Sequence, residues 1–523
     1  MRREFGYLPI LLASLAACGR CGSRPPPAPS VSVEDLLPRS PQAVVVIPSI
    51  SGFMGAASGL ASAVARFPEG ETAGGMLEAL GTQLGFDPRD PKALAKSGID
   101  GSRPAAAVFE GAEPWAVVPV SDRARFRETA ARLAASRLGA DVVARQGETT
   151  VFSSKAGPAA ALAFANGYGL VAAGPSAAEE LARALGRAKG QRLSDEPLFT
   201  HAIQKLELGW NVAWYVPGGS PALPRQPPPG QAFAGSFSYR DGRLAARLVS
   251  MLSVAEGTAL SGFAKPAGQK LIGLLPPGDP LVARAGGDPA SLGFAWQALV
   301  PEPIRTAIAE AKIDVEREVL GNLAPGVALA VGLAPHLDLS SAPSLDPRRQ
   351  NPFRYLTLDA FAKVRDREKA LATLGKLRGL PSGLGVTTRR QRLSGAEVTT
   401  FQYALGDGPS VALVGDTLAV TGGEGEMESA LARLSGKANG YSPPPWMRPM
   451  LLGQISDGAV VDPAALRQSI EAIPPSAYGG LTGLTVRSLV RRFASPLIWL
   501  GPLTAMVDVK ADAVVADASL IFR

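Results

Sequence analysis

Short apolar stretches bounded by glycine, proline or polar residues recur along the chain. Several occur in pairs joined by turn-forming residues, as in "ALAFANGYGLVAAG" (161–174) and "VALVGDTLAVTGG" (411–423). Paired stretches of this kind predict β-hairpins. Between the pairs lie segments with apolar residues at helical spacing, such as Met76–Leu84. The pattern therefore predicts hairpins that are interrupted by single helices.

The longest of these segments predicts one amphipathic helix over Ile304–Leu320. Its apolar residues Ile304, Ile308, Val315 and Val319 would share one face of that helix.

The order of the predicted elements repeats at an interval of roughly 240 to 250 residues. A strand that runs into a charged helix begins at Trp115 and again at Tyr355, and a helix containing Leu-Ala-Arg occurs at 181–183 and at 431–433. Each copy closes with a long hairpin. We therefore expect an α+β fold with two tandem homologous lobes, each an antiparallel or mixed β-sheet with helices packed on one face. The first lobe would cover residues 34–260 and the second residues 270–523.

The chain begins with an export signal. Met1-Arg2-Arg3 is followed by an apolar run up to Ala17, so residues 1–17 predict a signal peptide. Leu15-Ala16-Ala17-Cys18 resembles the lipobox of bacterial lipoproteins. That resemblance implies a mature chain that starts at Cys18 and is anchored in a membrane by lipid, including palmitate, on this residue. Residues 18–33 then form a proline-rich tether.

Gly19 follows the predicted lipidation site, where enteric lipoproteins that stay in the inner membrane carry aspartate. The sequence therefore favours an outer-membrane lipoprotein, on the periplasmic face in preference to the surface. No cysteine follows Cys21, so the folded part has no disulfide and no thiol nucleophile.

One further tract, 43–65, contains no charged residue. Pro48 and the many serine and glycine residues within it predict a strand, a turn and a helix of small residues in place of a membrane span.

Composition restricts the class of partner. The formal net charge is +7, 46% of the residues are hydrophobic and 19% are charged. These values are typical of folded globular chains and not of disordered or polytopic ones. Because the charge is spread thinly and the chain is exported, we expect no nucleic-acid partner. The sequence gives no indication of the oligomeric state.

No assembled catalytic chemistry is apparent. The two histidines, His201 and His336, have no ligand spacing for zinc, and phosphate-binding loops and the hydrolase Gly-x-Ser-x-Gly elbow are missing from the sequence. We therefore predict no catalytic residue, no metal and no cofactor. Two acidic groups, Glu424/Glu426/Glu428 and Glu179/Glu180, are interpreted as helix starts that complement the helix dipole.

Two apolar features are candidates for binding. Trp210 and Trp214 share a strand face by their even spacing, and together with Phe237 they are candidates for lining a ligand cavity. The segment 493–507, which follows Arg487, Arg491 and Arg492, is interpreted as strand, with a membrane contact as the alternative.

Two segments, "LLPRSPQAVVVI" (36–47) and "LGFDPRDPKALAKSGIDGSRPAAAVF" (84–109), carry a family resemblance. The chain resembles uncharacterised exported lipoproteins of myxobacterial type that carry a domain of unknown function. The resemblance brings no catalytic residues to this sequence. The second copy departs from the pattern, with "LGNLAPGVALAVG" in place of the second segment.

The leading hypothesis is a non-enzymatic lipoprotein of the cell envelope that acts as a binding or assembly module at the membrane surface, with an envelope protein as partner. A first alternative is a carrier or sensor of an apolar, lipid-like ligand, which a large apolar cavity would favour. A second alternative is a hydrolase of unrecognised type, which clustered carboxylates or a Ser-Lys pair in a cleft would favour.

Overall fold

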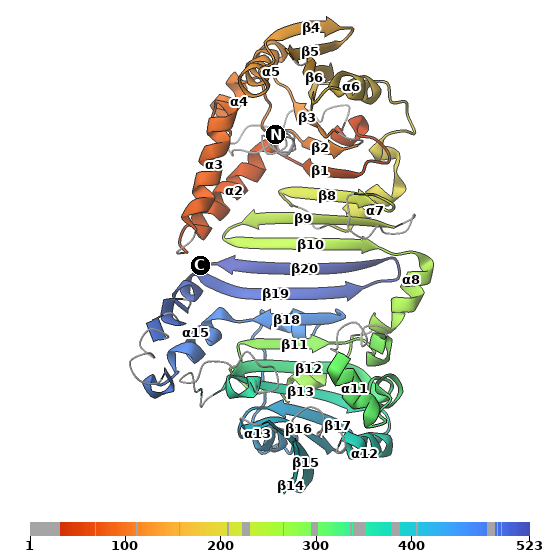
Figure 1. Cartoon of the computed structure of the whole chain (residues 1–523), viewed down its shortest axis with the longest axis vertical. Coiled ribbons are helices and arrows are strands. Elements are labelled where there is room, and N and C mark those ends of the chain that lie inside the picture. Colours follow the sequence, from red (N-terminus) through yellow and green to blue (C-terminus); the bar gives the residue numbers. More distant parts are fainter. Residues whose placement is uncertain are drawn as a thin grey trace. The chain divides into compact units, whose positions relative to one another are not determined.

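The computed structural model describes residues 32–523, except 68–69, 111–112, 156, 207–208, 222–230, 265, 294–301, 335–336, 338–350, 378–386, 404–405, 479–486, 489 and 493. The chain is α+β and divides into two compact units, the first ending at Ser253 and the second running from Val254 to Ile521. Figure 1 labels the elements of both.

The first unit contains an antiparallel sheet. Its strand order is β10–β9–β8–β1–β2–β3–β7–β6–β5–β4. The strands are β1 (Ala43–Ile47), β2 (Ala105–Phe109), β3 (Trp115–Pro119), β4 (Val142–Gln146), β5 (Thr149–Ser154), β6 (Gly157–Ala165), β7 (Tyr168–Ala173), β8 (Val212–Pro217), β9 (Ala232–Arg240) and β10 (Arg243–Met251).

The second unit also contains an antiparallel sheet. Its strand order is β20–β19–β18–β11–β12–β13–β17–β16–β15–β14. The strands are β11 (Leu281–Ala285), β12 (Leu323–Leu333), β13 (Leu356–Val364), β14 (Thr387–Leu393), β15 (Ala396–Tyr403), β16 (Gly406–Val414), β17 (Thr417–Gly422), β18 (Asp457–Val461), β19 (Leu500–Val509) and β20 (Ala513–Phe522).

The cross-strand register gives corresponding positions in the two sheets. In the first unit, Trp115 on β3 lies opposite Ala172 on β7. In the second, Asp359 on β13 lies opposite Thr421 on β17. Both pairs stand at the same step of the strand order. Strands β3 and β13 each lead into a helix that is capped by an aspartate, Asp122 after β3 and Asp366 after β13.

The helices flank these strands. In the first unit they are α2 (Ile50–Val64), α3 (Glu71–Leu84), α4 (Pro91–Lys96), α5 (Arg123–Leu138), α6 (Ala177–Leu185) and α7 (Pro197–Gln204). In the second unit they are α8 (Val254–Ala259), α9 (Gln269–Ile272), α11 (Glu302–Glu310), α12 (Arg367–Lys376), α13 (Glu426–Leu434), α14 (Arg448–Leu451) and α15 (Pro463–Glu471).

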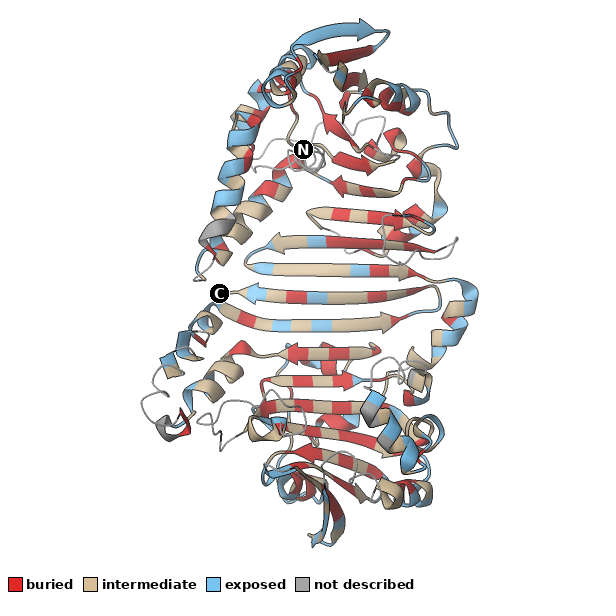
Figure 2. Cartoon of the chain, in the orientation of Figure 1, coloured by how far each residue is buried: buried red, intermediate tan, exposed pale blue. Residues whose placement is uncertain are grey.

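The prediction that helices pack on one face of the sheet is wrong. Phe126 of α5 packs over Gly169 of β7, whereas Arg187, which follows α6, stacks on the Trp115 ring from the other face. Consecutive residues of β3 are all buried, so side chains pointing in both directions are covered. Figure 2 shows the buried residues along these strands. A sheet that is apolar on both sides needs helices on both sides.

The single helix predicted over Ile304–Leu320 is also wrong. Helix α11 ends at Glu310, and Lys312 adopts a left-handed backbone with φ 56°. The Asp314 side chain then accepts a hydrogen bond from the Arg317 amide and starts a separate π-helix, η6 (Val315–Val319). A left-handed residue cannot continue a right-handed helix, so the chain turns there.

The uncharged tract 43–65 forms strand β1, a turn at Pro48 and helix α2, as predicted. Within the described residues, no helix is both long and apolar enough to cross a membrane.

Candidate functional site

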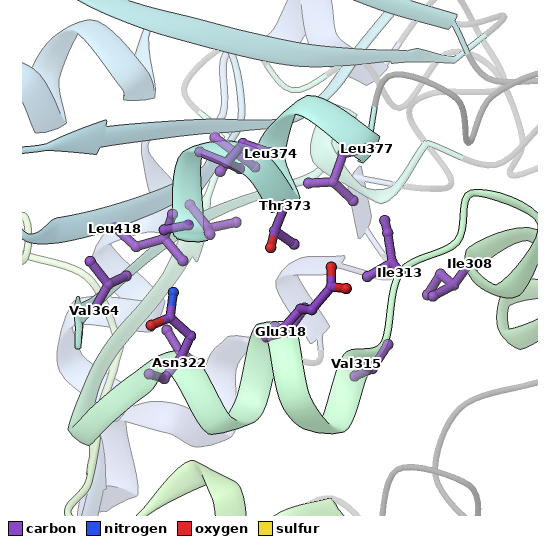
Figure 3. Close-up of a pocket in the computed structure, with 15 residues that line it drawn as sticks. Ile308, Ile313, Val315, Glu318, Asn322, Val364, Thr373, Leu374, Leu377 and Leu418 are labelled. Atoms are coloured by element: carbon purple, nitrogen blue, oxygen red, sulfur yellow. The ribbon is translucent and has the colours of Figure 1, made fainter. Parts of the chain in front are cut away.

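An apolar pocket of about 290 Å³ lies in the second unit, between helix α12, π-helix η6 and the sheet. Figure 3 shows the side chains of α12 and η6 pointing toward one another across this space. Its volume is close to the lower end of the range for small-molecule sites, roughly 300 to 1,000 Å³. It is lined by Ile308, Ile313, Val315, Glu318, Val319, Asn322, Leu323, Val364, Ala370, Thr373, Leu374, Leu377, Val411, Leu418 and Val420.

The three polar residues of the lining already have hydrogen-bond partners. Asn322 donates from its amide to the Asp366 carbonyl at 2.9 Å and accepts from the Asp366 amide at 2.9 Å. The Thr373 hydroxyl donates to the Lys369 carbonyl at 2.9 Å, and both oxygens of Glu318 accept from Lys376 at 2.6 and 2.7 Å. The pocket therefore offers a ligand apolar surface, and no unpaired polar group in it requires a polar ligand atom.

Two lysines of α12 fix the segment that forms one wall. Lys376 donates to the Lys312 carbonyl at 3.0 Å in addition to its ion pair with Glu318. Two helical turns earlier in α12, Lys369 donates to the Arg317 carbonyl at 2.8 Å. These bonds hold η6 against α12, and the apolar residues Val315 and Val319 of η6 line the pocket.

The corresponding place in the first unit is filled. Phe126 is the fourth residue after the capping Asp122, and Ala370 is the fourth after the capping Asp366. Phe126 is buried, packs edge-on against Phe164 with ring centroids 6.2 Å apart, and belongs to a large apolar core. Its ring packs so closely over Gly169 that a Cβ on this residue would lie only 2.5 Å from the ring.

In the second unit the residue at the Gly169 position is Leu418, the second residue of β17 as Gly169 is of β7. The pair of Phe126 and Gly169 is thus replaced by Ala370 and Leu418. The aromatic ring is lost from the helix, and the strand gains a smaller side chain in return. The pocket lies between α12 and the sheet, as Phe126 lies between α5 and the sheet in the first unit.

The candidates for a cavity in the first unit lie elsewhere. Trp214 is half-buried on β8 and covers its cross-strand partner Gly235, while Phe237 on β9 pairs with Val212 and is 49% exposed. Register places Trp214 and Phe237 on one face of the sheet, and Trp210 precedes that strand. None of the three lines the apolar pocket, and their role in ligand binding stays a prediction.

The remaining candidate residues are two that the structure does not describe and one histidine. Cys18 and His336 lie outside the described residues, and His201 is exposed on α7. Across the described ranges, no group of three or more histidine, cysteine, aspartate or glutamate side chains is arranged to hold a metal ion.

The helix-dipole interpretation of Glu426 is incomplete. Glu424 and Glu428 are exposed, but Glu426 is partly buried against Asp359 on β13. Asp359 is fully buried and accepts from Arg433 at 2.6 Å. Burial raises the pKa of Asp359 to about 7, and Glu426 adds to the rise while Arg433 opposes it. Burial likewise raises the pKa of Glu426.

These clustered carboxyl groups are of the kind that a hydrolase site would use, but a substrate cannot reach them. Asp359 has no exposed surface, so a substrate cannot touch it in this conformation. The apolar pocket is therefore the better candidate for a functional site. Sequence reasoning missed it, although the exchange of Phe126 for Ala370 after equivalent capping aspartates is visible in the two copies.

No protein-family model and no curated protein matches the chain. Three solved structures, described as crystal forms IV, I and III of TP0453, align with 44% of this chain and with 85%, 85% and 86% of theirs. Their sequence identities are 13%, 12% and 13%, and the TM-scores are 0.25, 0.23 and 0.24. Scores this low do not establish a shared fold.

Proposed function

We propose that this chain is a non-enzymatic, lipid-anchored protein of the cell envelope whose second unit binds an apolar ligand. The observation that carries the proposal is the pocket between α12 and η6, whose polar lining residues are already hydrogen-bonded within the protein. Such a site recognises a ligand by shape and burial of apolar surface, as an alkyl or acyl chain would provide.

The energetics favour occupation of this space. A closed and empty cavity of this volume would destabilise the fold by roughly 7 kcal/mol at about 24 cal/mol per Å³, and an open pocket by less. The first unit avoids that loss with Phe126 and Phe164. A retained apolar space at the equivalent place of the second unit is consistent with a ligand that supplies the missing contacts.

The two units are in our proposal tandem homologous lobes that arose by duplication. In support, the strand order is the same in each, and Trp115 and Asp359 hold the same register position. Duplication leaves one copy free to keep the packed core while the other acquires a binding site.

The location is proposed from the sequence. The positive start at Arg2 and Arg3, the apolar run before Cys18 and the proline-rich tether that follows support lipidation at Cys18 and attachment to the outer membrane, on its periplasmic face. A ligand with an alkyl chain would be available at such a surface. Replacement of Cys18 by serine should abolish incorporation of an alkyne-labelled fatty acid, and equal labelling of both proteins would refute the anchor.

The binding proposal is tested by calorimetric titration with hexanol, octanol, decanol and dodecanol. Burial of each added methylene should contribute about 0.8 kcal/mol to the free energy of binding. The affinity should therefore rise roughly tenfold for every two carbons until the pocket is full. An equal response to all four alcohols, or no binding of any, would contradict the proposal.

Two variants locate the binding. The double substitution Ala370→Phe with Leu418→Gly reproduces the first unit's pair and should abolish binding of decanol. Ala372→Phe makes the same change on the exposed side of α12 and should leave binding unchanged. Binding that survives in the double variant, with its circular dichroism spectrum intact, would place the ligand elsewhere.

A further inference from the structure

A group of four ionisable side chains fastens helix α13 to the sheet of the second unit. We call it the acid cluster; its members are Asp279, Asp359, Glu426 and Arg433. Asp359 projects from β13, Glu426 and Arg433 belong to the two ends of α13, and Asp279 precedes β11. The acid cluster lies on the opposite face of β13 and β17 from the pocket. Asp359 pairs with Thr421 of β17, and Thr421 points away from the face that carries the pocket residues Leu418 and Val420.

Charges in the acid cluster do not balance when all four groups are ionised. One guanidinium faces three carboxyl groups, and Arg433 is bonded on one side to Asp359 at 2.6 Å and on the other to the Leu274 carbonyl at 2.7 Å. The second oxygen of Asp359 and one oxygen of Asp279 are buried, and with every carboxyl group ionised they face no hydrogen-bond donor among the described residues. A buried excess of negative charge is unfavourable, so protons must neutralise it.

The surroundings offer little else to neutralise the excess. The Thr421 hydroxyl, directly opposite Asp359, is itself buried and without a partner among the described residues. Thr357 and Gly332 complete the floor, where a Cβ on Gly332 would lie 2.4 Å from an Asp279 oxygen and 2.6 Å from the Thr357 hydroxyl. Arg433 is thus the one cation that the described elements around Asp359 direct at it.

We propose that the acid cluster is a proton-operated latch that fastens α13 to the sheet. With one proton shared between Asp359 and Glu426 and a second on Asp279, the carboxyl pair is hydrogen-bonded and Arg433 neutralises the one remaining charge. Loss of the shared proton leaves two carboxylates side by side, and their repulsion favours release of the helix. This inference concerns a different site from the apolar pocket and does not depend on ligand binding.

The direction of the effect follows from the titration. Burial raises the pKa of Asp359 to about 7 and that of Asp279 to about 6, with Glu426 contributing to both. A carboxyl group whose pKa is raised in the folded state stabilises the fold below its unfolded pKa, and this stability is lost as the pH rises through the folded value. The latch is therefore closed in acid and opens near neutrality.

The test is hydrogen exchange of the α13 amides in the full chain, corrected for intrinsic exchange, between about pH 5 and about pH 8. We expect protection of α13 in the wild type to fall by roughly tenfold or more across this range and to level off above about pH 7. Each pH unit between the ordinary pKa of a carboxyl group in the released helix and its raised pKa in the closed latch corresponds to a factor of ten. Protection of α12, which lies on the other face, should change much less.

Two neutral substitutions should remove the dependence. Asp359→Asn mimics the protonated state of a buried residue. Glu426→Gln mimics the protonated state at a partly exposed position, where the substitution should not impair folding. The matched control is Glu428→Gln, an exposed residue of the same helix, which should keep the wild-type response. A flat profile in the wild type, or an identical profile in Glu426→Gln and Glu428→Gln, would overturn the proposal.

Discussion

The two units build the same helix–sheet junction with opposite results. After the cap at Asp122, α5 places Phe126 over Gly169, and the space is a packed core. After the cap at Asp366, α12 places Ala370 at that position and β17 offers Leu418, and the space is a pocket. A reciprocal exchange of large and small residues accompanies this difference between a structural core and a candidate binding site.

The opposite face of the same strands shows a second difference. Where the first unit buries Trp115 under Arg187, whose guanidinium lies 5.4 Å from the ring centroid, the second buries Asp359 beside Arg433. An arginine supplied from the helix region meets an aromatic face in one unit and a carboxylate in the other. In our proposal the second contact depends on protons, because it involves buried carboxyl groups. In our proposals the second unit therefore responds to an apolar ligand and to pH, and the first unit to neither.

The largest effect is expected from emptying the first unit. Phe126→Ala should lower the free energy of unfolding by about 3 to 5 kcal/mol, because a buried ring is removed from a packed core. Leu374→Ala, beside the existing pocket, should cost clearly less because Leu374 is only half-buried. Urea denaturation measures both. Equal losses would mean that the two junctions are packed alike.

The next effect concerns pH. Stability of the second unit should fall by a few kcal/mol as the pH rises from about 4 through about 7, because carboxyl groups with raised pKa values hold protons that the unfolded chain has released. Asp359→Asn should flatten this slope. Urea midpoints followed at several pH values test it, and a slope of the opposite sign would contradict the protonated cluster.

A smaller effect separates the two halves of the exchange. Ala370→Phe alone should destabilise the protein by about 1 to 3 kcal/mol, since the new ring meets Leu418 where the first unit has glycine. Adding Leu418→Gly should recover part of this loss. Thermal unfolding of the single and double variants gives the coupling, and strictly additive changes would show that the two residues do not meet.

The smallest effect is expected at the wall of the pocket. Lys376→Met removes an ion pair whose side chains remain partly exposed, so the stability change should be within about 1 kcal/mol. Ligand exchange should nevertheless become faster, because η6 loses one of its two lysine contacts. Stopped-flow release of bound decanol measures the rate, with Lys510→Met, on a partly exposed ion pair with Asp508 beside the β19–β20 turn, as control.

Local sequence signals predicted much of the fold. The hairpins and the strand–turn–helix over 43–65 followed from turn residues and apolar spacing. Helices on both faces did not follow, although the continuous apolar run of β3 carries that signal. The turn at Lys312 was missed because the left-handed residue is a lysine and not a glycine; its carbonyl accepts a hydrogen bond from Lys376 of α12.

The pocket and the acid cluster depend on partners far apart in the sequence. Ala370 is unremarkable in a helix until Leu418 is known to face it, and Glu426 reads as a helix start until Asp359 is known to lie beneath it. A lone aspartate in the apolar strand "LTLDAFAKV" was the available hint of a buried site. Only the register of β13 against β17 shows what surrounds it.

Photolabelling with a diazirine-bearing decanol, followed by peptide mass spectrometry, tests the central claim most directly. The account predicts modification of α12 and of the β17 residues around Leu418, saturable by unlabelled decanol and absent in the Ala370→Phe, Leu418→Gly variant. Labelling that instead falls on α5, or on the strand face of Trp214 and Phe237, would contradict a pocket specific to the second unit.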